Sequence, residues 1–290
     1  MVGSILTKSQ KAGYVTARGT ADYRDERSPE GSAAFKKLIG DTYDVVDVNL
    51  EEAIPDDIAV LIINGPREAF SDYQLYLIDQ FLMKGRSALF CIDSYQEMQM
   101  NQMQGMYGQE PPVLPVTTGL DGLLNHYGVS VKKNIVLDEK CAKVNLGSAV
   151  RDYPLVPVIE KKGLSRDSVV TRYLSSAVFI KASEVALDLD RLKSAGLHGQ
   201  TLVTSSAASW TMSGRISFNP FTMDAGEKGD MKSRSLAVAV SGRLESYFRG
   251  KEVPAPDKKD SDKKNAEKKN QGGMIQSVSR LDETVRSGES

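Results

Sequence analysis

The chain has few of the residues on which common active sites depend. Its 290 residues include two cysteines, two histidines and one tryptophan. Two histidines and two scattered cysteines give no zinc-site spacing. Neither the Gly-x4-Gly-Lys-Ser/Thr phosphate loop nor the GxGxxG dinucleotide fingerprint occurs in the sequence. We therefore expect no metal and no cofactor.

The chain also lacks a long hydrophobic run and an excess of charge of one sign. Its longest strongly apolar stretch is residues 58–63, whereas a membrane-spanning helix needs about 20 residues. The first residues have no signal-peptide core, so the sequence taken alone is typical of a cytosolic protein. With 37 basic and 38 acidic residues the net charge is −1. Because no global field would attract nucleic acid, we expect no nucleic-acid partner.

The two cysteines do not form a disulfide framework, although a single bridge between Cys91 and Cys141 stays open. Cys91 lies inside the apolar run 88–92. We therefore expect a free thiol that is buried as a small hydrophobic residue and points into the core.

The first half of the chain alternates short strand patterns with helical patterns. The run 58–63 is apolar throughout, as is typical of a parallel strand that is covered on both faces. Strand, helix and strand at this spacing predict right-handed crossovers and an open parallel sheet. We expect an α/β fold with flavodoxin-like strand order, because the early units are short and have no dinucleotide fingerprint. The expected strands are 12–16, 43–48, 58–63, 88–92 and 135–138, and the expected helices are 32–39, 71–84 and 119–128.

The pattern becomes β-rich in the second half, with strands expected at 177–181, 201–204 and 236–240. We interpret residues 1–250 as a single α/β domain, with a core at about 10–140 and a β-rich extension at about 150–250. Ten of the 13 residues from 257 to 269 are charged, so we expect a mostly disordered tail at 251–290. Mild helical periodicity at 274–285 indicates a piece that can dock back onto the domain.

Polar residues follow three of the predicted strands. Ligand sites of open α/β sheets lie at the carboxyl ends of the strands, so we expect these residues to converge on one cleft that binds a ligand or a partner. The alternative is that they are ordinary loop residues and helix caps. The candidates are Arg18, Asp22, Asn64, Arg67, Asp93, Ser94 and Tyr95.

Catalysis is the less favoured interpretation. A hydrolase or amidotransferase-like enzyme would use Cys91 or Ser94, but neither lies in the glycine-framed turn that presents such a nucleophile. A nucleophile also needs a base, and His126 and His198 lie in a helix and in a glycine-flanked loop. We therefore expect a protein that is not an enzyme.

Four methionines gather in the glutamine-rich segment 97–109, namely Met98, Met100, Met103 and Met106. Thioethers are soft ligands that suit Cu(I). We favour the simpler interpretation, in which the methionines form an adaptable contact surface.

Several segments together carry a family resemblance: KAGYVTARGT (11–20), YDVVDVNL (43–50), IPDDIAVLIINGP (54–66), LYLIDQFLMKG (75–85) and GLDGLL (119–124). In this order, the chain over about residues 10–250 resembles the gliding-motility-associated (GldG-like) auxiliary components of ABC-type transporters.

The resemblance implies an extracytoplasmic domain at the periplasmic face of the cytoplasmic membrane. Membrane anchors absent from this chain would hold it beside an ABC permease and its ATPase. The fold would be related to the class I amidotransferase-like sheet without its catalytic residues, and a glycan or small ligand would be an alternative occupant of the cleft. The chain departs from the family in having no anchor and no hydrophobic strand after the charged segment, so it looks like an excised ectodomain.

Overall fold

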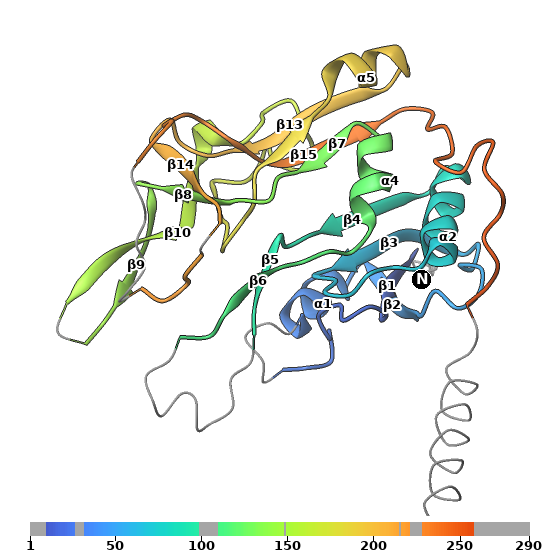
Figure 1. The fold of residues 1–290 in the computed structure, drawn as a ribbon, viewed down its shortest axis with the longest axis horizontal. Coiled ribbons are helices and arrows are strands. Elements are labelled where there is room, and N and C mark those ends of the chain that lie inside the picture. Colours follow the sequence, from blue (N-terminus) through green and yellow to red (C-terminus); the bar gives the residue numbers. More distant parts are fainter. Residues whose placement is uncertain are drawn as a thin grey trace, which may run out of the picture.

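A computed structural model describes residues 10–26, 32–98, 110–147, 149–214, 216–220 and 228–257. Residues 258–290 of the predicted tail 251–290, which include the predicted helical piece 274–285, lie outside these residues, as do Met100, Met103 and Met106. Figure 1 shows a parallel α/β layer beside a group of small antiparallel sheets. Within the described residues, none of the helices combines the length and the hydropathy that crossing a bilayer requires.

The centre of the α/β layer is a four-stranded sheet in the order β2-β1-β3-β4. All three pairings are parallel. This order corresponds to the first four strands of the flavodoxin-like arrangement and confirms the predicted fold class. The strands are β1 (Gln10–Val15), β2 (Tyr43–Val48), β3 (Ile58–Asn64) and β4 (Ser87–Cys91).

Helices cover the two faces of this sheet unequally. Helices α2 (Asp72–Met83) and α4 (Leu120–His126) contribute to the largest apolar core on one face. Helix α1 (Ala33–Ile39) contributes only partly buried residues to a smaller core on the other face. Helix α2 begins as predicted, because Ser71 forms a capping box with Gln74.

The environment of Cys91 differs from the prediction. The residue is a free thiol, as expected, but it is exposed rather than buried. Strand β4 is an edge strand whose alternate residues are exposed, and the smaller core under α1 contains residues of β1, β2 and β3 but none of β4. The buried thiol was predicted from the apolar run 88–92. Because only one face of β4 is covered, a residue inside this run can still be exposed.

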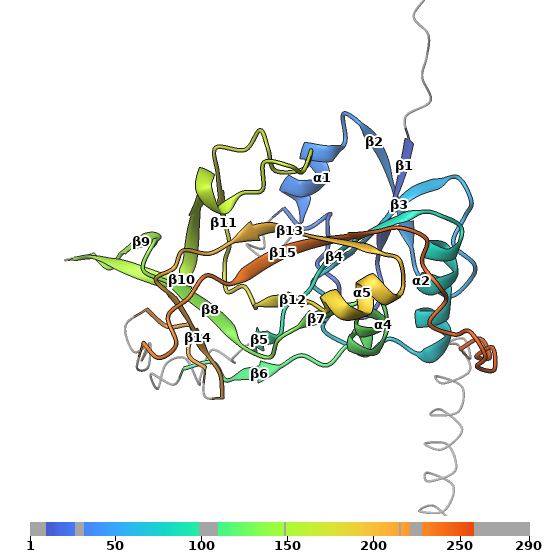
Figure 2. The ribbon, with the colours of Figure 1, turned by 90° about the horizontal axis from the view of Figure 1, so that it is seen from above.

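The small antiparallel sheets form the predicted β-rich extension, and Figure 2 shows them beside the parallel layer. They begin earlier than predicted, because they include strands between residues 95 and 138, within the part that was predicted as the core of the parallel fold. The predicted strand at 135–138 exists, but it pairs antiparallel with β14 instead of extending the parallel sheet. The three-stranded sheet β11-β10-β9 and the pairs β12-β7, β13-β15, β14-β8 and β5-β6 complete it. The remaining elements are β5 (Tyr95–Glu97), β6 (Val113–Pro115), β7 (Val129–Val131), β8 (Ile135–Asp138), β9 (Cys141–Asn145), β10 (Val150–Glu160), η1 (Lys161–Gly163), β11 (Ser176–Val178), β12 (Val185–Leu187), α5 (Leu189–Ser194), β13 (His198–Thr204), β14 (Ser209–Met212) and β15 (Ser235–Ser241).

The C-terminal segment, which we define as residues 242–257, returns from the extension to the parallel layer. Figures 1 and 2 show it, in orange to red, running from β15 to the side of α2. Leu244, Tyr247 and Phe248 pack on the core formed by α2 and α4. The fully buried carboxylate of Asp79 in α2 accepts hydrogen bonds from Ser246 Oγ (2.6 Å) and from the backbone N–H of Tyr247 (2.8 Å). A buried charged acceptor therefore fixes this segment on the helices.

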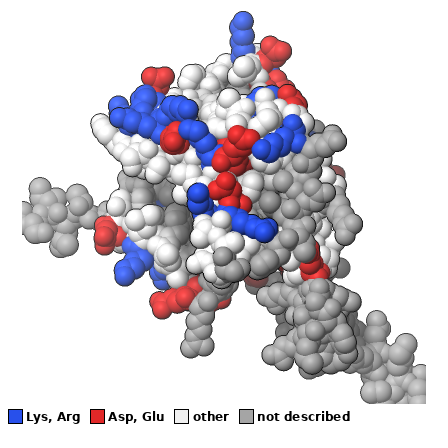
Figure 3. Space-filling view, turned by 90° about the vertical axis from the view of Figure 1, so that its left-hand side faces the viewer, with Lys and Arg blue, Asp and Glu red and all other residues white. Residues whose placement is uncertain are grey.

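Figure 3 shows the side of the molecule that carries β9 and β10. Lys and Arg side chains alternate there with Asp and Glu over a largely uncharged surface. On this face, charges of the two signs lie close enough to offset each other's field.

Candidate functional site

Three loops meet at the carboxyl edge of the parallel sheet, where ligand sites of such folds lie. The backbone N–H of Ala21 donates to Asn64 O, that of Gly65 to Cys91 O, and that of Arg67 to Arg18 O, each at 2.9 Å. The loops after β1, β3 and β4 therefore hold one another through main-chain hydrogen bonds.

Arg18 is the most constrained residue of this edge. Its φ of 59° lies in the left-handed region, which a residue with a Cβ adopts at some cost in energy. Its carbonyl oxygen accepts from the N–H groups of Arg67 and Glu68, and its Nε donates to Gln74 Oε1 at 2.6 Å. Such over-determined backbone gathers at functional sites. The guanidinium is thereby held beside the first turn of α2.

A carboxylate of the chain itself occupies this position. Asp257, in the C-terminal segment, accepts a hydrogen bond from Ser71 Oγ at 2.6 Å. The same oxygen lies 3.6 Å from Arg18 Nη2. Positive charge from the guanidinium and from the helix N-terminus both favour an anion there. The arrangement is therefore suited to a carboxylate.

The remaining candidates of the β1 and β3 loops serve different neighbours. Asn64 Nδ2 donates to Tyr14 Oη (3.1 Å) and to Ser32 Oγ (2.6 Å), so this amide ties β3 to the start of α1. Asp22 accepts from the backbone N–H of Arg24 within its own loop. Arg67 is exposed beside the loop of Arg18.

Asp93 also lies at this edge. A Cβ placed on Gly65 would be 3.8 Å from Asp93 Oδ2 and 3.9 Å from the Cβ of Ala21. The carboxylate of Asp93 is thus close to the turn that follows β3, and it adds an acidic group to the edge.

Ser94 and Tyr95 bond away from Arg18. Ser94 is buried and its Oγ donates to Lys132 O at 2.8 Å, and Tyr95 Oη donates to Lys133 O at 3.1 Å. Both hydroxyls therefore join the β4 loop to the start of the β-rich extension. The predicted residues share one edge of the sheet, but the hydroxyls of Ser94 and Tyr95 bond to the extension and not to the loop of Arg18.

The groups that a nucleophilic enzyme would need lie in different environments, and His198 begins a strand instead of lying in the predicted loop. The pKa of the Cys91 thiol is raised, first by desolvation from the surrounding elements and then by the charge of Asp93, although the residue itself is exposed. A raised pKa lowers the thiolate fraction and with it the reactivity. The ring nitrogens of His126 contact Glu245 O (2.9 Å) and Arg191 Nη2 (3.1 Å). His198 lies exposed at the start of β13.

An open hollow lies away from this edge, on the α1 side. It has a volume of about 680 Å³, and its lining includes Tyr23, Arg24, Lys36 and Tyr43. Burial alone would raise the pKa of the neighbouring Asp47, but the hydrogen bonds from Tyr23 and Arg24 and the charges of Arg24 and Lys36 together outweigh it and lower this pKa. The basic side chains are partly neutralised by these contacts, which makes the hollow a weaker candidate for anion binding than Arg18.

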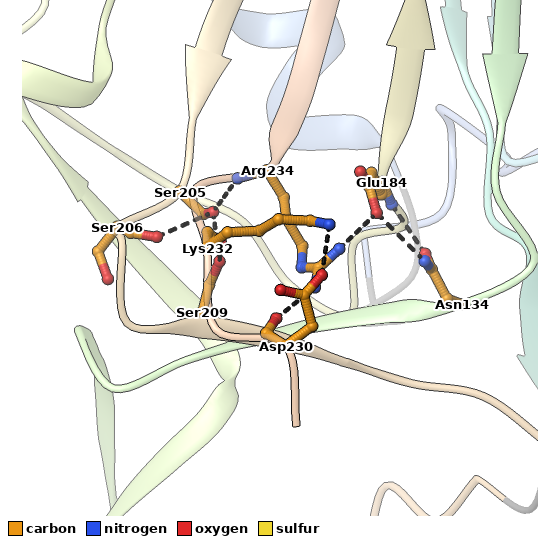
Figure 4. A network of polar contacts seen from close by, with 8 residues as sticks. All are labelled: Asn134, Glu184, Ser205, Ser206, Ser209, Asp230, Lys232 and Arg234. Atoms are coloured by element: carbon orange, nitrogen blue, oxygen red, sulfur yellow. Dashed lines mark hydrogen bonds and ion pairs between the residues drawn. The ribbon is translucent and has the colours of Figure 1, made fainter. Parts of the chain in front are cut away.

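A second buried polar network lies in the β-rich extension (Figure 4). Arg234, whose side chain is 7% exposed, contacts Glu184 Oε2 at 3.0 Å and donates to Asp230 O at 2.7 Å. Ser205 Oγ accepts from the backbone N–H of Arg234 (2.8 Å) and lies 2.7 Å from Ser209 Oγ. These bonds tie β12, β13, β14 and β15 together, so the network accounts for the packing of the extension.

Sequence reasoning missed the partners that define the carboxyl-edge site. Ser71 is the first residue of the predicted helix 71–84, and its hydroxyl caps this helix and also binds the carboxylate. Gln74 was not singled out, although a glutamine three residues after a capping serine is a recognisable capping box. Asp257 gave no signal, because it contacts a residue 186 positions away.

A sequence profile of the family described as "ABC-type uncharacterized transport system" matches residues 10–276. A curated protein of uncharacterised function from Borreliella burgdorferi is 24% identical over 225 residues, which are 75% of this chain and 42% of the relative. The chain thus spans less than half the length of that relative.

Two solved structures have a similar arrangement. The mmIFT52 N-terminal domain is 11% identical, with 77% of this chain and 83% of that domain covered and a TM-score of 0.46. A ThuA-like protein from Bacteroides uniformis is also 11% identical, with 71% and 72% covered and a TM-score of 0.38.

Proposed function

The chain belongs to the family of auxiliary domains of ABC-type transport systems, and from this premise we propose that it is a non-catalytic binding domain of a membrane-anchored accessory subunit. In this proposal the subunit is of the gliding-motility (GldG-like) type and the domain lies on the extracytoplasmic, periplasmic face. It contacts the ABC permease, which in turn is assembled with the ATPase.

The observation that carries the binding role is the contact of Asp257 with Arg18 and Ser71. A site that holds a carboxylate of its own chain has the charge and the donors to hold a carboxylate of another protein. We propose that an acidic side chain of the partner displaces Asp257. Because the segment that carries Asp257 is anchored through Asp79 at a separate place, its end can leave while its middle stays bound.

The environments of the reactive groups support a role without chemistry. Ser94 is buried and bonded to a backbone carbonyl, and Cys91 has a raised pKa. Neither His126 nor His198 has a recorded contact with these two residues in the part of the chain that the structure describes. The alternative, a hydrolase or amidotransferase-like enzyme that uses Cys91 or Ser94, would need all of these arrangements to change.

The test is co-isolation of the full-length protein with its transporter subunits from membranes. Arg67→Glu places a negative charge beside the proposed carboxylate site, so we expect several-fold less permease to be recovered. Asp257→Ala removes the internal competitor, and we expect recovery to rise. Arg151→Glu, which reverses another exposed arginine on β10, is the matched control and should leave recovery unchanged.

Transport in cells separates the two functions. A Cys91→Ala and Ser94→Ala double variant should keep transport, after its fold has been verified by its unfolding midpoint. If a folded double variant loses transport while Arg67→Glu still recovers the permease normally, the binding proposal is wrong and the enzyme alternative is favoured.

A further inference from the structure

An ordered loop at residues 161–174, which we call the basic–apolar loop, displays large apolar side chains to solvent. Tyr173 is 86% exposed, Val169 69% and Val170 64%, and Leu174 beside them is also exposed. Isolated exposed apolar residues are common. Four of them within six consecutive positions form a contiguous apolar tip, which is a feature of interaction sites.

The loop is held in this form by its own polar contacts. The backbone N–H of Arg172 donates to Ser168 O at 2.9 Å, and Thr171 Oγ1 donates to Ser165 O at 2.8 Å. Arg166 donates to the carbonyl oxygens of Lys161 and Arg172. Ser168 and Thr171 are buried while the apolar residues between and after them are not. The polar side chains therefore face inward and the apolar tip faces outward without a collapse of the loop.

The charged residues of the loop itself are mostly basic, and Glu160, which directly precedes it, pairs with Lys140. The loop carries four basic residues, Lys161, Lys162, Arg166 and Arg172, against the single acidic residue Asp167. All five are exposed. The guanidinium of Arg172 lies 5.2 Å from the ring centre of Tyr173, so cation and aromatic ring form one unit at the tip. This local excess differs from the net charge of −1 of the whole chain.

The basic residues of the loop indicate that its binding surface is negatively charged. The cores of protein–protein interfaces are depleted of lysine, whereas aliphatic and aromatic residues flanked by Lys and Arg are typical of segments that bind the interface of an anionic bilayer. Long basic side chains can lay their apolar stems on such a surface and keep their charges at the headgroups.

We propose that the basic–apolar loop docks onto the surface of a bilayer that contains anionic phospholipid. Val169, Val170, Tyr173 and Leu174 enter the headgroup region, and the four cations contact lipid phosphates. This inference goes beyond the partner-binding role of the carboxyl edge and does not depend on it, because the loop and Arg18 share no recorded contact in the described part of the chain.

The experiment is co-sedimentation of the purified chain with vesicles of phosphatidylcholine alone and of phosphatidylcholine with about one third phosphatidylglycerol. We expect binding to the anionic vesicles only, and we expect it to weaken as salt shortens the screening length. Val170→Ser with Tyr173→Ser should lower the partition coefficient by about tenfold or more. Lys161→Gln with Lys162→Gln should lower it by about 25-fold, because each basic residue near an anionic surface adds about a fivefold factor.

A matched control is available in α1, where Leu38 is 78% exposed. Leu38→Ser removes an equally exposed apolar side chain outside the loop and should leave partitioning unchanged. Because every altered loop residue is exposed, the variants should keep the unfolding midpoint of the parent chain. Sedimentation velocity without vesicles tests self-association through the same loop.

Three results would each overturn the proposal. They are failure to bind anionic vesicles, equal binding by the Val170→Ser/Tyr173→Ser variant and the parent, and concentration-dependent dimerisation that this variant abolishes. The co-isolation test of the carboxyl edge measures permease recovery, so its result does not depend on any of these three results.

Discussion

Replacing Asp79 by alanine should release the C-terminal segment and destabilise the fold. This carboxylate is fully buried in α2 and accepts hydrogen bonds from Tyr127 Oη, Ser246 Oγ, Tyr247 N–H and Gln80 Nε2. In Asp79→Ala at least two of these donors, the buried hydroxyl of Tyr127 and the N–H of Tyr247, lose their acceptor. An unsatisfied buried donor costs about 1–3 kcal/mol, so we expect a loss of about 4 kcal/mol in the free energy of unfolding.

Urea denaturation measures this loss, and a second feature identifies its cause. If residues 242–257 detach, the native state buries less surface, so the slope of the free energy against urea should fall as well. Limited proteolysis should then cut within this segment in the variant before it cuts the parent chain there.

Asp121→Ala is the matched control. Asp121 lies on the neighbouring helix α4 and pairs with Lys133 at 3.5 Å with both side chains 44% exposed. An exposed pair contributes about 0–1 kcal/mol. If Asp79→Ala destabilises the chain no more than Asp121→Ala and leaves the segment protected, the reasoning about the buried acceptor is wrong.

Three further predictions concern single groups. The pKa of Tyr127 is raised, first by burial and then by the hydrogen bond and charge of Asp79. Because the folded state binds this proton more tightly, the free energy of unfolding should be constant below the unfolded pKa of about 10 and should fall as the pH rises above it. When unfolding is followed against pH, the fall should be smaller in Tyr127→Phe. Glu184→Ala removes the nearer carboxylate of the buried guanidinium of Arg234 and leaves only Asp230 Oδ2 at 4.0 Å, so it should destabilise the chain by about 3 kcal/mol in urea. Lys232→Ala, at an exposed pair, should change stability by less than about 1 kcal/mol. Cys91 is exposed and has a raised pKa, so a thiol reagent should label it in the folded chain slowly at neutral pH and faster as the pH rises. If the reagent labels Cys91 only after the chain unfolds, the thiol is buried and this prediction is wrong.

The parallel layer was predictable because its signals are local. The apolar run 58–63 is β3, and Ser71 with Gln74 marks the start of α2 within one turn of sequence. Strand order followed from the short connections. These elements depend on neighbours in the chain, so propensity and pattern are sufficient to find them.

What was missed depends on contacts between distant residues. Strand β10 contains Pro154 and Pro157, which argue against a strand, and its pairing with β9 shifts register between Tyr153 and Pro157. The exposure of Cys91 depends on which strand lies at the sheet edge, which no local pattern specifies.

One signal in α2 was available. Asp79 lies on the apolar stripe of this helix, one position after Ile78 and four after Leu75. A charged residue at a core position needs a hydrogen-bonded partner. The sequence could therefore have indicated a buried acceptor, but its partners in residues 246 and 247 could not be found without the fold.

The measurement that tests the central claim most directly is photo-crosslinking from position 67 in the full-length protein, in its own membranes, with the products identified by mass spectrometry. The account predicts a crosslink to the ABC permease from position 67, and more of it when Asp257 is replaced by alanine. Crosslinks that contain no transporter subunit, with the same pattern in both backgrounds, would contradict it.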